Sequence, residues 1–452
     1  MSHEIARMSL MDEEKVESYS FDVIGGKDVM PILGYYGPVL FDEEWKNKGA
    51  ELVFPDRFSE EFFELIAGTG INIIGKSDTN YAEHPEIVER ALKLAAKNGL
   101  GMLVNDQRLN EEDGKTLSLE EVEACVKAYK DYPAYIGNYV VDEPNHREYW
   151  NPGNADKRLV EAYFPIFHKL QALGLFGYGN LFSNWMHADE EVYKKYIADF
   201  VEGTKIPYLS YDMYPFDSNS MQYVPRYFRN LTQIREKAEA AGIPFWTFVQ
   251  AGAQWNDACK CFDSDGYFPS KGQFFWNVGT ELAFGAKGMQ YFPLIQPVWF
   301  AYAESMPYDF ERNGLIGADG RKTRWYDYAK AMNAQIAAVD EVLMNSVNKG
   351  VIVTGSEARE HMGTSQYLME GTSWRELAGV EGNTFIGCFN YKGNTALYVV
   401  NYDLEKEQTI TLNLADTYRV TVIENAEKES MLTDRIVLEF SAGNHALVVF
   451  DE

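Results

Sequence analysis

The chain has 452 residues, more than one compact core usually holds, so a large domain and a smaller one are expected. Hydrophobic residues make up 46% of the sequence and charged residues 24%, a balance that excludes a disordered chain. The formal net charge of -27 disfavours nucleic acid and anionic membranes as partners and favours a neutral or cationic ligand.

The cysteines and the N-terminus bear on metal binding and location. Cys259 and Cys261 are too close for an easy disulfide, and Cys125 and Cys388 do not complete a zinc site with them. We therefore expect reduced thiols, no metal and no other cofactor. Residues 1–18 contain no apolar signal segment, and no long uncharged apolar run follows. We expect a cytoplasmic protein that does not enter a membrane, although a leader removed earlier would leave the same picture. The oligomeric state stays open.

Residues 1–27 are expected to form an N-terminal extension, in which 18–26 is either an early strand or a cover for the floor of the next domain. Residues 28–345 then alternate short apolar runs with amphipathic stretches, which predicts a (β/α)8 barrel. Ser59 and Ser118 stand where helices should begin, and Gly70 and Gly99 where the chain should leave a helix. Strands are predicted at 31–38, 71–78, 101–107, 135–144, 175–183, 207–216, 244–252 and 288–297.

Residues 346–452 follow a different pattern. Apolar and polar residues alternate there with a period of two, and turn residues separate the runs, which predicts a small antiparallel β-sandwich. The whole chain is rich in aromatic rings, with 29 Tyr, 27 Phe and 9 Trp. Such rings either stack on sugars in a binding cleft or fill the core of a large barrel, and the sequence leaves both interpretations open.

The active site of such a barrel lies at the C-terminal ends of its strands. Carboxylates, amides and phenols dominate these ends, while no His or Cys occurs there, which disfavours a metal hydrolase or a cysteine nucleophile. Three tryptophans, Trp185, Trp255 and Trp299, fall in later loops and are candidate stacking platforms. The strand-end residues are Tyr35, Tyr36, Asp78, Asp106, Asp142, Glu143, Asn180, Asp212, Tyr214, Gln250, Tyr291 and Gln296.

The sequence VVDEPN at 140–145 carries the sharpest signal. It places Asp142 and Glu143 side by side where the fourth apolar strand leaves the core, and Pro144 then ends the strand. Neighbouring strand residues normally point to opposite faces, but a β-bulge at the strand end can bring both carboxyl groups into one cleft. The alternative is a capping or salt-bridging pair in a loop.

This motif resembles the acid/base signature of clan A glycoside hydrolases, in which Asn-Glu-Pro follows the fourth strand and Asp142 here replaces the Asn. MPILGYYGP and GINIIG resemble strands one and two of bacterial members. PFWTFVQAGAQW, ELAFGAKGMQYFPLIQP and RNGLIGADGRKTRWYDYAKAMNAQI resemble their strand seven through helix eight. The resemblance implies a barrel that hydrolyses glycosides, with Glu143 as general acid/base. It also implies a nucleophilic Glu after strand seven, where this chain has Gln250.

Three hypotheses follow for a carbohydrate ligand. In the first, Glu143 is the acid of a glycoside hydrolase and Asp212 the second carboxylate, unless Asp212 only orients a tyrosine. In the second, Asp142 and Glu143 serve a substrate-assisted N-acetylhexosaminidase, which needs no carboxylate at Gln250. In the third, the barrel binds sugar without hydrolysing it. The residues expected to bind the substrate are Tyr36, Asp78, Asn180, Tyr214, Gln250, Trp255, Tyr291 and Gln296.

Overall fold

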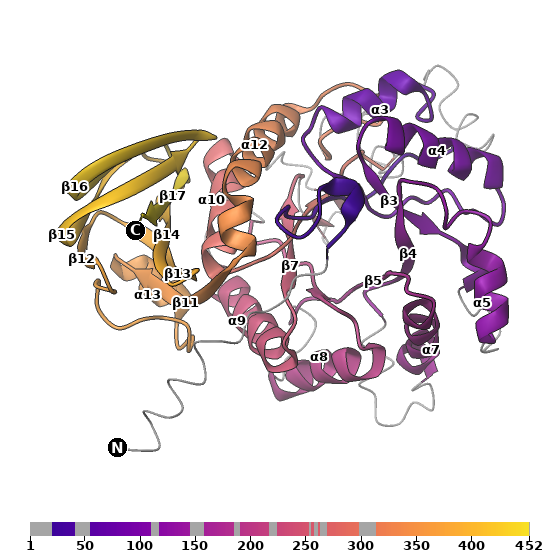
Figure 1. Cartoon of the computed structure of the whole chain (residues 1–452), viewed down its shortest axis with the longest axis horizontal. Helices are drawn as coiled ribbons and strands as arrows, with labels where there is room; N and C mark the ends of the chain where they lie inside the picture. Colours follow the sequence, from indigo (N-terminus) through magenta and orange to yellow (C-terminus); the bar gives the residue numbers. More distant parts are fainter. Residues whose placement is uncertain are drawn as a thin grey trace.

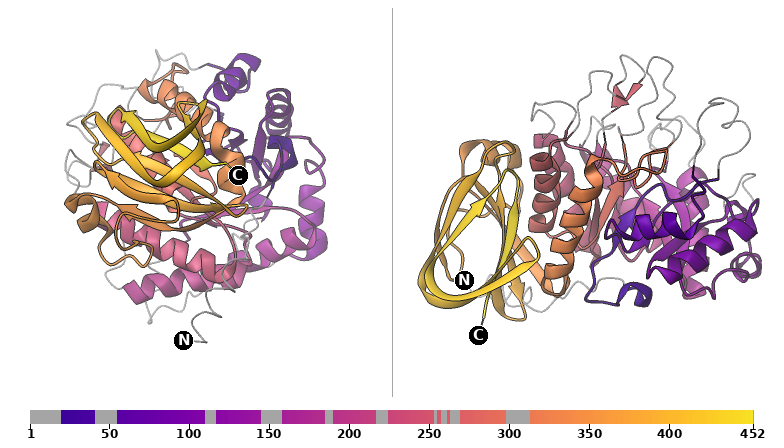
Figure 2. Two further views of the ribbon diagram at one scale, coloured as in Figure 1. Left: turned by 60° about the vertical axis from the view of Figure 1, so that its left-hand side comes forward. Right: turned by 90° about the horizontal axis from the view of Figure 1, so that it is seen from above.

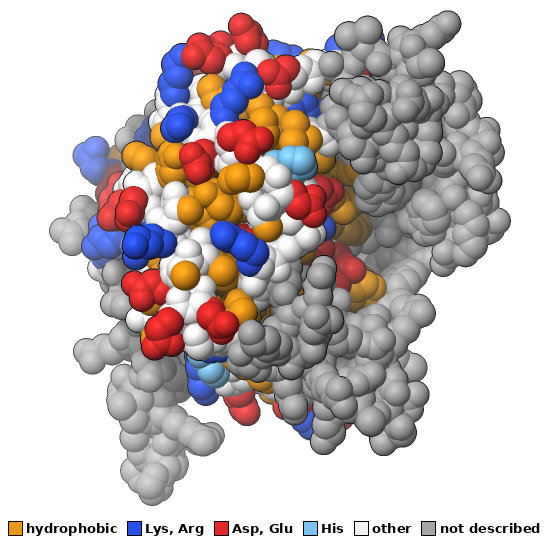
Figure 3. All heavy atoms as spheres, turned by 90° about the vertical axis from the view of Figure 1, so that its right-hand side faces the viewer, with side chains coloured by type: hydrophobic (Ala, Val, Ile, Leu, Met, Phe, Trp, Pro, Cys, Tyr) orange, Lys and Arg blue, Asp and Glu red, His pale blue; other side chains and the backbone are white. Residues whose placement is uncertain are grey.

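The computed structural model of the chain contains a barrel and a β-sheet domain that lie against each other (Figure 1). No described helix combines the length and apolar character that crossing a membrane requires. Charged side chains of both signs are interspersed with apolar ones on the face shown in Figure 3. The structure describes residues 20–40, 55–109, 117–144, 158–184, 190–216, 224–252, 269–297 and 313–451, and only the backbone of 158–162, 255–256 and 261–262.

Eight parallel strands form the barrel, as the sequence predicts. Each strand pairs with the next barrel strand in chain order except at β5 and β6, and β10 pairs with β1. A parallel bridge between Leu181 and Tyr211 joins the remaining ends, so the ring is nearly closed. The strands are β1 (Ile32–Gly34), β2 (Ile73–Ile74), β3 (Gly101–Asn105), β4 (Tyr135–Asp142), β5 (Gly177–Asn180), β6 (Leu209–Ser210), β7 (Phe245–Gln250) and β10 (Met289–Phe292).

Helices surround this ring (Figure 1). The two predicted start signals are confirmed, because the Ser59 hydroxyl accepts from the Phe62 N–H and Ser118 forms a capping box with Glu121. Gly70 and Gly99 have φ of 82° and 68°, a conformation that favours glycine. The helices are α3 (Glu60–Ala67), α4 (Pro85–Lys97), η2 (Gln107–Leu109), α5 (Leu119–Val126), α7 (Arg158–Ala172), α8 (Glu190–Thr204), α9 (Val224–Ala241), α10 (Lys271–Phe284) and α12 (Arg324–Met344).

Stacked aromatic rings fill the barrel interior. The ring of Tyr178 stacks on Tyr139 at 6.0 Å and on Tyr208 at 6.2 Å, and Tyr208 stacks on Trp246 at 4.0 Å. Phe21 covers the floor, 6.4 Å from Trp246. Phe21 directly precedes the 3-10 helix η1 (Asp22–Ile24). The interpretation of 18–26 as a cover for the barrel floor is therefore confirmed, and the interpretation as a strand is wrong.

The C-terminal part is a single antiparallel sheet of seven strands. Strand β15 is long enough to pair with β12 and β16 through its first half and with β17 and β16 through its second. The two halves of the sheet enclose a hydrophobic core of their own. The elements are β11 (Ser346–Val353), α13 (Ser356–Met362), β12 (Leu377–Glu381), β13 (Thr384–Tyr391), β14 (Asn394–Asn401), β15 (Gln408–Glu424), β16 (Glu427–Phe440) and β17 (His445–Phe450), and β8 (Trp255–Asn256) pairs with β9 (Cys261–Phe262) elsewhere.

Helix α10 lies between the barrel and this sheet (Figure 2). All but the first of its residues are buried. The approach is close, because a Cβ at Gly387 of β13 would overlap the carbonyl oxygen of Ala283 in α10. Glycine at this position therefore lets a strand of the sheet pack directly on the helix backbone.

Candidate active site

The backbone at the end of β4 turns two successive carboxyl groups toward the barrel mouth. The pairing of β4 with β5 shifts in register between Tyr139 and Val141, an irregularity of the kind that a β-bulge produces. Glu143 then has φ of 45°, and its backbone N–H donates to the Asn180 carbonyl at 2.9 Å. Asp142 and Glu143 are both half-buried, so both remain accessible.

Asp212, which follows β6, completes a group of acidic side chains that we call the carboxyl cluster: Asp142, Glu143 and Asp212. The Glu143 carboxyl hydrogen-bonds to Asp212. Asn180 connects Asp142 with Asp212, because its Nδ2 donates to Asp142 Oδ1 at 3.1 Å and to Asp212 Oδ1 at 3.0 Å. The structure thus brings together four residues that the sequence placed on three different strands.

Burial raises the pKa of each carboxyl group in the cluster. The charges of Asp212 and Asp142 raise the pKa of Glu143 further, while the Lys76 ammonium partly offsets these effects. Hydrogen bonds from Asn180 lower the pKa of both aspartates relative to burial alone. The proton shared by Glu143 and Asp212 therefore belongs on Glu143 at neutral pH.

Aromatic rings and one ion pair lie around the cluster. The ring of Phe292, the last residue of β10, is 5.6 Å from Tyr36 and 5.6 Å from Tyr214. Lys76 Nζ lies 3.4 Å from Asp78 Oδ1 and 5.2 Å from the Tyr36 ring centroid. Tyr36, Asp78 and Tyr214 were predicted from the sequence, whereas Lys76 and Phe292 were missed. Their signal was present, since each stands at or just beyond the end of a barrel strand.

Two of the predicted substrate contacts need correction. The Tyr291 hydroxyl donates to Asn333 of α12 at 2.7 Å and its ring stacks on Phe274, so the side chain faces away from the mouth. The Gln250 amide donates to the Phe216 carbonyl at 2.6 Å and accepts from the Phe216 N–H at 3.1 Å. Gln250 thus holds the backbone after β6. Gln296 is buried, and its substrate role stays a prediction.

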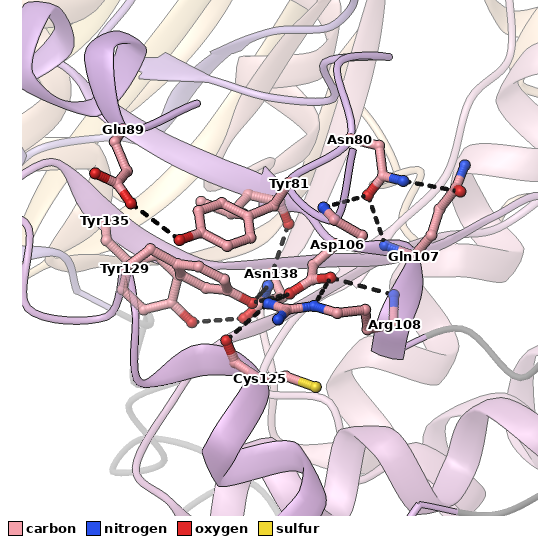
Figure 4. Close-up of polar contacts among 12 residues, drawn as sticks. Asn80, Tyr81, Glu89, Asp106, Gln107, Arg108, Cys125, Tyr129, Tyr135 and Asn138 are labelled. Atoms are coloured by element: carbon pink, nitrogen blue, oxygen red, sulfur yellow. Dashed lines mark hydrogen bonds and ion pairs between the residues drawn. The ribbon is translucent and has the colours of Figure 1, made fainter. Parts of the chain in front are cut away.

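Asp106, another strand-end residue, belongs to a structural network (Figure 4). Its carboxylate accepts from Arg108 at 2.6 and 2.8 Å and from the Tyr129 hydroxyl at 2.9 Å. Arg108 also donates to the Cys125 carbonyl at 2.9 Å, and Tyr129 accepts from Asn138 at 2.9 Å. With every oxygen engaged, Asp106 joins the end of β3 to α5 and to the outer face of β4.

The three tryptophans predicted as stacking platforms stay predictions. Trp185 and Trp299 lie outside the described residues, and only the backbone of Trp255 is described. In the described part of the chain, no three His, Cys, Asp or Glu side chains are arranged to hold a metal ion.

No protein-family model and no curated protein sequence matches this chain. Among solved structures, it is similar to a catalytic mutant of a GH42 β-galactosidase from G. stearothermophilus, with 10% identity and a TM-score of 0.55 over 96% of this chain and 100% of that chain. It is also similar to a GH51 arabinofuranosidase from Xanthomonas axonopodis pv. citri, with 8% identity and a TM-score of 0.49 over 94% and 96% of the two chains. Fungal β-1,4-galactanases match with 13% identity and a TM-score of 0.42 over 67% and 99%. The likeness is one of fold, and these structural neighbours are glycoside hydrolases.

Proposed function

We propose that the chain is a glycoside hydrolase that cleaves O-glycosidic bonds of an oligosaccharide or glycoside, with Glu143 as general acid/base. The observation that carries this proposal is the Glu143 carboxyl, which is half-buried at the barrel mouth, hydrogen-bonded to Asp212 and has a raised pKa. A carboxyl group that keeps its proton at neutral pH can donate it to a glycosidic oxygen, and an ionised one cannot. The fold likeness to a GH42 β-galactosidase supports the same class of reaction.

The contact between Glu143 and Asp212 bears on the second catalytic group. Retaining glycosidases separate their two carboxyl groups by about 5–5.5 Å and inverting ones by about 6.5–9.5 Å. Asp212 lies close enough to Glu143 for each group to affect the pKa of the other, which makes Asp212 the candidate second carboxyl group. The separation of the two groups in a sugar complex decides which of the two outcomes applies.

The adjacent carboxyl groups of Asp142 and Glu143 support a second candidate function, a substrate-assisted N-acetylhexosaminidase. There the 2-acetamido oxygen of the substrate attacks the anomeric carbon, Asp142 polarises the amide and Glu143 protonates the leaving oxygen. Asp212 needs no place across the sugar in this mechanism and only holds the Glu143 carboxyl. Gln250, bonded to backbone groups, is then compatible with activity.

A panel of aryl glycosides that includes N-acetylhexosaminides tests both candidates. We expect turnover of at least one substrate and a loss of about 10²–10⁴-fold in Glu143→Gln, because the general acid is removed while its shape is kept. The loss should shrink for substrates with a good leaving group, which need less protonation. Glu89→Gln removes a carboxyl group that accepts from Tyr81 (Figure 4) and from Tyr132, away from the cluster, and serves as the matched control.

The outcomes separate the three hypotheses. Strict dependence on an N-acetyl group supports the substrate-assisted mechanism, and equal cleavage of a plain hexoside removes it. An undiminished rate in Glu143→Gln contradicts the role of Glu143. Saturable binding of an oligosaccharide without any turnover by the unaltered protein replaces the enzyme with a sugar-binding barrel.

A further inference from the structure

Asn180 contacts all three members of the carboxyl cluster. Its side-chain Nδ2 carries two hydrogens, and these go to Asp142 Oδ1 at 3.1 Å and Asp212 Oδ1 at 3.0 Å. Its backbone carbonyl accepts from the Glu143 N–H at 2.9 Å. The side chain is 1% exposed, so these contacts replace water as its partners. A single buried amide thus holds the two aspartates and fixes the backbone of the glutamate.

A line of hydrogen bonds through the barrel interior fixes which way this amide points. The Ser210 hydroxyl donates to Asn180 Oδ1 at 2.7 Å, and Gln290 Nε2 donates to that hydroxyl at 2.8 Å. Gln290 Oε1 accepts from the Tyr178 hydroxyl at 2.6 Å. We call these four residues the Tyr178–Asn180 chain. All four are buried, and burial raises the pKa of Tyr178 so that its phenol stays a donor.

Reversing the amide would break this chain. The Asn180 oxygen would then face the two aspartates in place of its donors, and the Ser210 hydroxyl would lose the oxygen to which it donates. Because buried polar groups without a matching partner are costly, the observed orientation is strongly preferred. Donors directed at Asp142 and Asp212 stabilise their ionised forms, whereas the charges of these two aspartates favour the protonated form of Glu143 and outweigh the opposing effect of Lys76.

We infer that Asn180, oriented by the Tyr178–Asn180 chain, is a positioning residue that keeps the proton of the carboxyl cluster on Glu143. The catalytic use of that proton rests on the proposed function, but its placement does not. The other titratable groups that face the cluster are Tyr35, Tyr36, Lys76, Asp78, Tyr139, Tyr178, Tyr193, Tyr196, Tyr211 and Tyr214.

Infrared difference spectroscopy on the full chain, titrated without substrate, tests this placement. In the unaltered protein we expect a protonated carboxyl band at neutral pH that is absent in Glu143→Gln and retained in Asp212→Asn, beside a Glu281 band that all these variants keep. In Asn180→Ala the aspartates lose their donors, so the next proton should bind at a pH about one unit higher, a roughly tenfold gain in proton affinity. Asn180→Asp keeps the shape and adds a carboxyl group, so it should not restore the original titration.

Asn333→Ala is the matched control, because Asn333 is also a buried amide with both ends hydrogen-bonded: it donates to the Thr69 carbonyl and accepts from the Tyr291 hydroxyl, away from the cluster. We expect it to lower stability without moving the titration of the cluster. If Asn180→Ala does not fold, Ser210→Ala decides, since it removes only the orienting donor and should shift the titration in the same direction by less. A cluster titration that is unchanged in the folded variant overturns the inference.

Activity separates this inference from the proposed function. If the protein hydrolyses glycosides, the acidic limb of its kcat/KM profile should move upward by about one pH unit in Asn180→Ala, and Asn333→Ala should leave that limb in place. A shifted titration in a protein that hydrolyses no glycoside supports the placement of the proton and refutes the proposed function. An unshifted titration in a protein that does hydrolyse glycosides supports the proposed function and overturns the placement of the proton by Asn180.

Discussion

Glu281 of α10 is a carboxyl group buried without a cation among its described contacts. It is 1% exposed and accepts from the Tyr227 hydroxyl at 2.8 Å, the Thr247 hydroxyl at 2.8 Å and Asn277 Nδ2 at 2.9 Å. Burial raises its pKa to about 8, although the three hydrogen bonds work in the opposite direction. The native protein therefore holds this proton at neutral pH, whereas the unfolded chain releases it.

The sign of the resulting pH dependence follows from proton linkage. Between the ordinary pKa of 4.5 and the native value of about 8, the folded state binds more protons than the unfolded state. The stabilisation from this group is complete below the lower value and is lost as pH rises through the upper one. Each pH unit costs about 1.4 kcal/mol, so roughly 3 kcal/mol is lost by pH 7 relative to a permanently neutral group.

Glu281→Gln makes the group permanently neutral with little change of shape. We expect its stability to match that of the unaltered protein near pH 4 and to exceed it by roughly 3 kcal/mol at pH 7. Urea denaturation followed by tryptophan fluorescence at several pH values measures the difference, in which all other titrating groups cancel. An exposed substitution, Glu61→Gln, controls for the lost charge and should stay within about 0.5 kcal/mol. A difference between Glu281→Gln and the unaltered protein that does not vary with pH refutes the reasoning.

Three further outcomes follow. Asp106→Asn leaves the Arg108 guanidinium partly unpaired, so the free energy of unfolding in chemical denaturation should fall by about 3–5 kcal/mol. Asp56→Asn breaks an exposed ion pair with Arg90 and should lower it by under about 1 kcal/mol. Gly387→Ala should cost about 1–3 kcal/mol by overpacking on α10. Gly379, which has open space around it, should tolerate Ala; equal costs would contradict the close approach. If the protein hydrolyses glycosides, kcat/KM should rise with pH as the two aspartates of the carboxyl cluster ionise, and it should fall at higher pH as Glu143 ionises. Both limbs should lie well above pH 4.5. An acidic optimum would count against the raised pKa values.

Much of the architecture was predictable because it depends on local patterns. Apolar runs separated by amphipathic stretches specify each strand and helix, and the period-two pattern after residue 345 specifies the antiparallel sheet. Asp142 and Glu143 were also predictable, because an acidic pair directly after a long apolar strand has few structural explanations. The alternation of strand faces suggested a bulge near this strand end, and the register of β4 with β5 does shift there, between Tyr139 and Val141.

The errors at the site have an equally local cause. The sequence favoured Tyr291, but its neighbour Gln290 points into the barrel and joins the Tyr178–Asn180 chain. Adjacent strand residues face opposite sides, so choosing the wrong one of two reverses the assignment. The chain itself was unpredictable, because Tyr178, Ser210 and Gln290 come from three separate strands and meet only when the ring forms.

The burial of α10 on both sides has a consequence for any attempt to divide the molecule. A fragment that ends at residue 345 would keep this helix but lose the strands that cover Phe275, Trp276 and Gly279, which contact Tyr402 and His445. Its exposed rings would invite self-association. The β-sheet half is thus part of the scaffold that holds α10, and through it β7, in place, and unfolding should melt both halves in one transition.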